Sequence, residues 1–416
     1  MLPSSPLPPL RLSAPALSGR PGAALTLSTV ARLVASGAAV SKADLVPASG
    51  LARTTVSTAV DELVDRGLLR LDGTRPTPGR GRPADRLALA ARGGHVLLAD
   101  FGARGAHLAV VDLSQRVLAH EHVDLDVRDG PDTALDVVES RLGALRAEGP
   151  PDVPTRAVVI GLPGPVDGHL GIPVRPPIMP GWHADPVSAR LERRFGCPAV
   201  LENDVNLRAL GEARALPADQ APLLFVKIGT GIGVWLVGRE GGLHHGADGA
   251  AGDIGHVRVR GAPDEGCVCG NVGCIEAVAS AAAIVRRLAS EGHAVATIAD
   301  LRALIARGDA AAVGAVRDAA ALIGELVATL VHFYNPARVT IGGSLTASSD
   351  DLLAGVRSVV YQRALPLATR NLVLTSSTLG EYAGLAGAAV LGIERVLSAD
   401  SIGALTAARS PAGARR

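Results

Sequence analysis

The sequence predicts an α/β protein of two lobes that follow a small N-terminal helical module. Two patterns support this fold class. Beyond residue 94, apolar strands alternate with helices, and this alternation occurs twice. Before residue 67, apolar side chains recur at helical spacing between glycines. A chain of 416 residues that is 48 % hydrophobic and 19 % charged can form more than one globular domain.

The N-terminal module is predicted to contain three helices and a two-stranded wing. The first helix ends at Gly37, and Ser41 is placed to cap a second helix over 42–48. After a tight turn at 49–51, a third helix over 54–66 faces its hydroxyl groups outward. The wing strands are expected at 68–71 and 86–89.

Each of the two lobes is predicted from its own group of strands and helices. For the first lobe we expect strands over 95–101, 106–113, 117–125, 157–161 and 198–202, with a helix over 133–147. For the second we expect strands over 223–228, 233–237, 339–341 and 372–375, with helices over 275–291 and 309–334. A final helix over 381–396 completes the arrangement, and we expect a cleft between the lobes.

Charge is distributed unevenly along the chain. Residues 1–92 hold 12 basic and 6 acidic side chains, whereas the whole chain has a net charge of +1. A basic module joined to an acidic remainder indicates that the first segment contacts an anionic partner. Lysine occurs only at Lys42 and Lys227, which we attribute to coding composition.

Composition also predicts the location of the protein. No apolar run is long enough to span a bilayer, so we expect no membrane contact. Residues 1–22 lack the basic start of a signal peptide, and we expect disordered tails there and at 398–416. Four cysteines, three of them clustered, favour a reducing cytoplasm over a disulfide scaffold.

A histidine followed by three clustered cysteines is the strongest chemical signal. Thiolates and an imidazole supply the four ligands that Zn²⁺ binds in a tetrahedron, and glycines among them permit tight turns around an ion. The alternative is that free cysteines lie close together by chance. We expect one structural zinc ion per chain, with Cys197 left out and the ligands His256, Cys267, Cys269 and Cys274.

Five motifs follow one another along the chain: Gly161-Leu-Pro-Gly-Pro-Val-Asp, Glu202-Asn-Asp-Val-Asn, Gly229-Thr-Gly-Ile-Gly, Gly252-Asp-Ile-Gly-His and the cysteine cluster ending in Glu276. Taken together they resemble those of the ROK family of repressors, open reading frames and sugar kinases. The resemblance covers residues 25–396 and extends to the regulators of that family that carry an N-terminal winged helix. It implies a two-lobed, actin-like ATPase fold, a sugar-kinase-like domain that closes over a ligand.

The resemblance implies a sugar site in the cleft. In the family's kinases the residue that matches Asp204 is the base that removes a proton from a sugar hydroxyl. Carboxylates beside hydrogen-bond donors suit a hydroxyl, which both donates and accepts. Two plainer interpretations remain: the pair before the helix could be a helix cap, and Asp253, where the family usually has Glu, could be a solvated acid. The implied sugar contacts are Asn203, Asp204, Asp253, His256 and Glu276.

The phosphate loops distinguish a kinase from a regulator. Family kinases carry Asp-x-Gly-Gly-Thr in the first loop, whereas this chain has Asp100-Phe-Gly-Ala-Arg104. Alanine for glycine and arginine for a small hydroxyl predict a decayed ATP site, although arginine can still hold phosphate. The second loop keeps the residues that let backbone amides approach phosphate, namely Gly229, Thr230, Gly231 and Gly233.

The third helix of the N-terminal module carries the expected DNA contacts. In a helix-turn-helix the N-terminal part of this helix enters the major groove. The wing sequence Arg80-Gly-Arg82-Pro resembles an AT-hook core that enters the minor groove, with ordinary phosphate contacts as the alternative. For the whole module the alternative is a small helical interaction domain. On the helix, the candidates are Arg53, Thr54, Thr55, Ser57 and Thr58.

These features favour a sugar-responsive, DNA-binding transcriptional regulator without kinase activity, most simply a repressor of carbohydrate-metabolism genes. We expect it to bind a double-stranded operator as a homodimer or homotetramer. The alternatives are an active ATP-dependent sugar kinase with a DNA-binding appendage and a regulator whose pocket is vestigial. The expected parts are a winged helix-turn-helix over 23–92 and an effector domain over 93–397, with lobe one at 93–205 and 378–397 and lobe two at 206–377.

Overall fold

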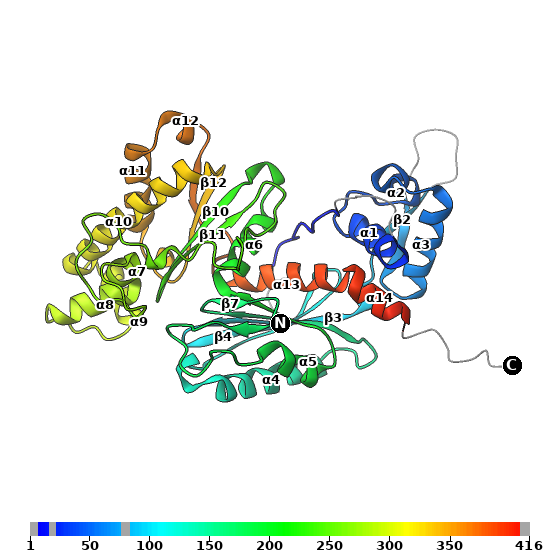
Figure 1. Cartoon of the computed structure of the whole chain (residues 1–416), viewed down its shortest axis with the longest axis horizontal. Coiled ribbons are helices and arrows are strands. Elements are labelled where there is room, and N and C mark those ends of the chain that lie inside the picture. The colour runs from blue at the N-terminus through cyan, green and yellow to red at the C-terminus, as the bar shows by residue number, and fades with distance from the viewer. Residues whose placement is uncertain (1–6, 16–21, 76–83, 408–416) are drawn as a thin grey trace.

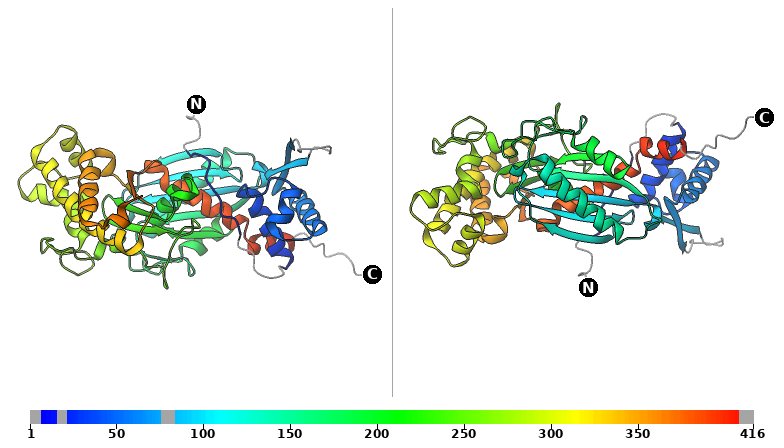
Figure 2. Two further views of the ribbon diagram at one scale, coloured as in Figure 1. Left: turned by 90° about the horizontal axis from the view of Figure 1, so that it is seen from above. Right: turned by 90° about the horizontal axis from the view of Figure 1, so that it is seen from below.

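The computed structural model describes residues 7–15, 22–75 and 84–407. The N-terminal helical module, lobe one and lobe two follow one another along the longest axis of the molecule (Figures 1 and 2). Lobe one lies in the middle and therefore contacts both of the other parts.

The N-terminal module is a winged helix-turn-helix. The side chain of Ser41 accepts a hydrogen bond from the N–H of Asp44 and so caps the second helix, as predicted. The expected wing arginines, Arg80 and Arg82, lie outside the described residues. The elements are α1 (Ala23–Ala35), α2 (Lys42–Ser49), α3 (Arg53–Asp65) and the antiparallel strands β1 (Leu69–Arg75) and β2 (Ala84–Leu89).

Lobe one is a five-stranded sheet of order β5-β4-β3-β6-β9 with helices on both faces. Alternate side chains of its strands pack against α4 and α5 on one face and against α13 on the other. The strands are β3 (His95–Gly102), β4 (Gly105–Asp112), β5 (Val117–Val123), β6 (Thr155–Leu162) and β9 (Ala199–Asn203), with the small pair β7 (Val166–Asp167) and β8 (Ile172–Pro173) beside them. The helices are α4 (Pro131–Ala147), α5 (Val187–Phe195) and α13 (Ala383–Val396).

Lobe two is a four-stranded sheet of order β11-β10-β12-β13, covered on one face by helices. The predicted helix over 275–291 is two helices, because Ser280 caps the second one through the N–H of Ala283. In the described part of the chain, no helix has the length and apolar character to cross a membrane. The strands are β10 (Leu223–Ile228), β11 (Ile232–Val237), β12 (Arg338–Gly342) and β13 (Val373–Ser376). The helices are α7 (Ile275–Ala279), α8 (Ala281–Ser290), α9 (Ile298–Ala306), α10 (Ala310–Tyr334), α11 (Asp350–Arg363) and α12 (Pro366–Thr369).

Helix α6 (Asp204–Ala215) lies between the two lobes and packs on both. One side contacts α13, and the other contacts the β10–β11 face of the lobe-two sheet. At the crossing with α13 the backbones nearly touch: a Cβ on Gly211 would lie 2.1 Å from the carbonyl oxygen of Ala383, and a Cβ on Gly387 would lie 1.8 Å from that of Leu207. The two helices are therefore held as one unit.

Both expected tails contain ordered structure. Leu7, Leu10 and Leu12 are buried in the core shared by the winged helix and lobe one. At the other end, residues 399–407 form helix α14 (Ala399–Ala407), which buries Ile402 and packs on α1. The prediction of disorder was wrong for these segments, because their apolar side chains find partners that are distant in sequence.

Candidate functional site

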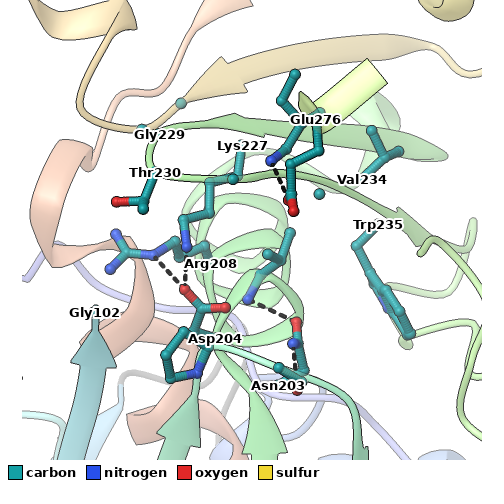
Figure 3. A pocket seen from close by; sticks show the side chains of 18 of the residues that line it. Gly102, Asn203, Asp204, Arg208, Lys227, Gly229, Thr230, Val234, Trp235 and Glu276 are labelled. Atoms are coloured by element: carbon teal, nitrogen blue, oxygen red, sulfur yellow. Dashed lines mark hydrogen bonds and ion pairs between the residues drawn. The ribbon is translucent and has the colours of Figure 1, made fainter. Parts of the chain in front are cut away.

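A cavity of about 610 Å³ lies between the lobes. Lobe one contributes the loop after β3 and the start of α6, and lobe two contributes the β10–β11 loop and the start of α7 (Figure 3). Segments far apart in the sequence therefore meet in one cleft. The sequence-predicted residues that line it are Asn203, Asp204, Gly229, Thr230, Gly231, Gly233, Asp253, His256 and Glu276.

Asn203 stands where β9 turns into α6. Its side-chain oxygen accepts hydrogen bonds from the N–H groups of Val205 (2.9 Å) and Asn206 (3.3 Å), which caps the helix. Its amide group donates to the carbonyl oxygen of Gly164 (2.9 Å). The capping interpretation therefore holds for Asn203, and capping fixes this side chain at the edge of the cleft.

Asp204 is paired with a cation from the opposite lobe. Its carboxylate, 1 % exposed, forms an ion pair with Lys227 of β10. The Nε atom of Arg208, one turn along α6, lies 4.0 Å from the same carboxylate oxygen. Figure 3 shows both cationic groups directed at this carboxylate. The Lys227–Asp204 pair thus links the lobes across the cleft.

Asp100 lies near the end of β3 and contacts the same group of charges. Its Oδ2 atom accepts a hydrogen bond from Nη2 of Arg208 at 2.7 Å, whereas Oδ1 has no partner among the described residues. Burial raises the pKa of Asp100 to about 6, although the nearby Arg208 opposes that shift. The first loop therefore presents a buried carboxylate whose charge is balanced within the protein.

The glycine loop between β10 and β11 is held by Glu276. The N–H of Ile232 donates to Oε2 of Glu276 at 3.0 Å. A Cβ on Gly231 would lie 2.3 Å from the same oxygen, so a larger residue there would displace this carboxylate. The N–H of Ile232, which lies between the predicted phosphate-loop residues Gly231 and Gly233, is thus already bonded to a carboxylate.

The position of Arg104 distinguishes the first loop from the phosphate loop of family kinases. Gly102 and Ala103 line the cleft, as the resemblance implies. Arg104 is exposed and is not one of the lining residues. Its guanidinium is therefore not placed to replace the small hydroxyl of family kinases.

The four expected metal ligands converge, with their ligand atoms within 4.8 Å of one another. The Sγ atoms of Cys269 and Cys274 are 3.7 Å apart, and Sγ of Cys267 lies 3.5 Å from Nδ1 of His256. Tetrahedral zinc would separate two sulfurs by about 3.8 Å and a sulfur from a nitrogen by about 3.6 Å. A disulfide would need about 2.05 Å. The cluster could therefore hold a metal ion, and Cys197 lies apart in the lobe-one core.

The N-terminal part of α3 is open to solvent. Arg53, Thr54, Thr55 and Thr58 are exposed. Ser57 is half-buried and accepts a hydrogen bond from Nζ of Lys42 at 3.0 Å. Four of the five predicted contact side chains are thus free to meet a partner, and the fifth has an internal one.

Sequence reasoning missed several residues of the cleft, among them Arg208, Lys227 and Trp235. Lys227 could have been found, because a chain that otherwise uses arginine keeps lysine at only one other position. Arg208 follows Asp204 by one helical turn, a spacing that places both on one face of α6. Trp235 gave no signal, since a tryptophan in a strand is usually a core residue.

The geometry agrees with comparisons to known proteins. Residues 97–395 match the ROK family, and the chain belongs to that family. It is 33 % identical over 247 residues to a glucokinase of Halalkalibacterium halodurans, covering 55 % of this chain and 73 % of that protein. It is 26 % identical over 368 residues to the xylose repressor of Caldicellulosiruptor bescii, covering 84 % of this chain and 90 % of that one.

A solved structure extends the likeness to the whole fold. The crystal structure of a ROK family transcriptional regulator, described as a homolog of the E. coli MLC protein, superposes with a TM-score of 0.74. The match covers 91 % of this chain and 97 % of that one at 24 % identity. The winged helix and both lobes therefore share the fold of that regulator.

Proposed function

We propose that this chain is a DNA-binding transcriptional regulator, acting as a repressor, whose cleft binds a sugar or sugar derivative. One observation carries the proposal: a winged helix-turn-helix is packed on lobe one of a two-lobed domain, and the cleft of that domain is lined by carboxylates and donors. The xylose repressor matches 84 % of the chain, whereas the glucokinase matches 55 %. Similarity to the repressor thus extends over more of the chain than similarity to the enzyme does.

The sugar would contact groups from both lobes. Asn203 and Asp204 lie on one side of the cleft, with Asp253, His256 and Glu276 contributed by the other lobe. Hydroxyls that bond both sets would favour the closed arrangement of the lobes, and closure would change the placement of the winged helices of a dimer or tetramer.

Substitution in the cleft tests the sugar site. Asp204→Asn and Glu276→Gln should each weaken binding of the responsive sugar by roughly 1–3 kcal/mol, because a buried partner is left unpaired. D-xylose, D-glucose and N-acetyl-D-glucosamine form the calorimetry panel. Asp124→Asn, at a 99 % exposed side chain, is the control. Wild-type affinity in both cleft variants would place the sugar elsewhere.

DNA binding follows from the basic charge of the first 92 residues and from the open face of α3. A symmetric oligomer should protect two half-sites separated by whole helical turns, and its affinity should fall steeply with salt. The proposal places the protein in the cytoplasm with its operator. Footprinting on duplexes selected from a random library, at two salt concentrations, tests both expectations.

An active sugar kinase is the second candidate. Asp204 at the base position favours it. Against it, Lys227 is ion-paired with the Asp204 carboxylate, Glu276 accepts a hydrogen bond from an N–H of the glycine loop, and Arg104 does not line the cleft. We expect no ADP release from ATP with the same sugars in a coupled assay. Sustained turnover would make the kinase the leading candidate.

We further propose that the Cys₃His cluster holds one structural zinc ion. The distances among its donor atoms fit a tetrahedral ion. Because His256 also lines the cleft, the ion would fix one wall of the sugar site.

A further inference from the structure

Residues 7–13, which we call the strap, run from lobe one to the winged helix ahead of α1. The strap is not a loose tail, because its backbone and side chains bond to three separate elements. The N–H and carbonyl of Leu10 pair with the side-chain amide of Gln115 in the β4–β5 turn, at 2.7 and 2.9 Å. Leu7, Leu10 and Leu12 are each less than 7 % exposed. The strap is therefore an integral part of the fold.

Arg11 of the strap caps the C-terminal end of α6. Its backbone N–H donates to the carbonyl of Arg214 (2.9 Å), its Nε to that of Leu216 (2.6 Å) and its Nη2 to that of Ala213 (2.6 Å). The last carbonyls of a helix have no partner within the helix, and a cation there also interacts favourably with the helix dipole. Arg214 returns a hydrogen bond to the carbonyl of Arg11 at 3.2 Å. The position of the strap is thus tied to the position of α6.

The other end of the strap is tied to the winged helix. The N–H and hydroxyl of Ser13 donate to Oε1 of Glu394 on α13, at 2.7 and 2.8 Å. The same hydroxyl accepts a hydrogen bond from Nη2 of Arg32 on α1 at 2.7 Å. Glu394 also lies 3.3 Å from Nη2 of Arg214, which closes a polar chain from α6 to α1.

The opposite end of α6 is the cleft itself. Asn203 caps that end, and Asp204 is its first residue. A helix of 12 residues is about 18 Å long, and close packing against α13 keeps it rigid. A sugar hydroxyl bonded to Asp204 would compete with Lys227 of lobe two. Any resulting shift of α6 would reach its far end, where Arg11 is bound.

We infer that the strap couples the cleft to the DNA-binding module. Arg11 moves with the end of α6 to which it is bonded, and Ser13 transmits that movement to α1 through its hydrogen bond with Arg32. The inference rests on the proposed function. It adds a defined route between the two sites, so that a ligand at one end of α6 changes the setting of the winged helix at the other.

The first test separates coupling from binding. Dissociation constants for a duplex selected by the wild-type protein from a random library are measured with and without D-xylose or D-glucose. The readout is the ratio of the dissociation constant with sugar to that without sugar. Arg11→Ala and Ser13→Ala remove contacts at opposite ends of the route, so in each variant this ratio should lie within about two-fold of one. Sugar affinity by calorimetry should stay at the wild-type value. Gln115→Ala, which frees the strap only from the β4–β5 turn, should keep the wild-type ratio.

The second test needs no sugar. Hydrogen exchange of the α1 amides is compared in the wild-type protein, in Asp204→Asn and in the double variant Asp204→Asn/Arg11→Ala. The substitution at the cleft should change the exchange rate of α1, and removing Arg11 should abolish that change. Gln115→Ala in the Asp204→Asn background should leave it intact.

The outcomes distinguish failure of the inference from failure of the proposed function. If the wild-type protein responds to sugar and both strap variants respond equally well, the strap does not carry the signal. The same conclusion follows if Gln115→Ala collapses the ratio, or if Asp204→Asn leaves α1 exchange unchanged. If neither sugar alters DNA binding by the wild-type protein, sugar sensing is in question, and the exchange experiment alone decides the coupling.

Discussion

Asp100 shows how one buried side chain can make stability depend on pH. Burial raises its pKa from 3.8 to about 6, since the Arg208 ion pair only partly offsets the lost hydration. The folded protein therefore keeps a proton on Asp100 at pH values where the unfolded chain has released it. The contribution of this group to stability falls as pH rises from near 4 through 6 and is constant above that range.

The prediction uses Asp100→Asn, which cannot titrate. Relative to the wild-type protein, the variant should gain about 1 kcal/mol in free energy of unfolding between pH 5 and pH 7.5. Urea unfolding at the two pH values measures the difference, and any constant cost of losing the Arg208 ion pair cancels. Asp124→Asn should show no such gain. A pH-independent difference for Asp100→Asn would mean that its pKa is not raised.

Side-chain identities in the cleft could be predicted, whereas their pairings could not. The order of the motifs in the sequence predicted that Asn203, Asp204 and Glu276 belong to one site, and all three line the cleft. The sequence did not reveal that Lys227 forms an ion pair with Asp204. Asp204 follows β9 and Lys227 lies in β10, and these strands belong to the sheets of different lobes, so only tertiary packing sets the distance between the two residues. The scarcity of lysine is attributed to coding composition, and that interpretation predicts no role for Lys227, which the structure places in the cleft.

At the scale of elements, local signals predicted most helices and strands. Ser41 and the glycines that follow each helix mark boundaries by local chemistry, so α1 to α3 lie close to their expected limits. The strap and α14 were missed for the opposite reason. A short apolar segment has no local reason to be ordered, and its leucines are buried only by elements that fold around it.

Helix α3 offers a test of DNA contact at this scale. Thr55→Ala or Thr58→Ala should reduce discrimination between a selected operator and a single-base variant of it by roughly 1–3 kcal/mol, since each exposed hydroxyl can face a base edge. Mobility shifts on both duplexes give the measurement. Thr329→Ala, an exposed threonine on α10, is the matched control. Unchanged discrimination in both variants would move base readout to other residues.

The cysteine cluster provides a second test among the elements. Purified protein should contain about one zinc ion per chain, and Cys269→Ser should lose it because only three ligands remain. Cys197→Ser is the matched control, since this buried thiol lies in the core of the other lobe. Elemental analysis of all three proteins decides the matter. Full zinc content in Cys269→Ser would refute the assignment.

At the scale of the whole molecule, the hydrophobic cores do not coincide with the winged helix, lobe one and lobe two. One hydrophobic cluster runs without interruption from the winged helix through the strap to α6, α13 and α14. Lobe two has a separate core. The winged helix should therefore melt together with lobe one, although its sequence is that of an independent module.

Hydrogen exchange and calorimetry together test this arrangement. We expect the α1–α3 amides to lose protection in the same transition as the lobe-one sheet. Removing zinc with a chelator should lower the transition temperature of lobe two first, because the cysteine cluster leads directly into α7 of that core. Chelator should have no further effect on Cys269→Ser. A winged helix that melts at its own lower temperature would contradict the shared core.

The continuous core also determines how chimeric regulators could be built from this protein. A graft that exchanges only residues 23–92 would leave the strap leucines and α14 facing a foreign surface. The portable unit is instead discontinuous: the strap, the winged helix and α14 together. A biosensor engineer who wants to keep the ligand response while changing the operator should leave these segments in place and redesign only the exposed positions of α3.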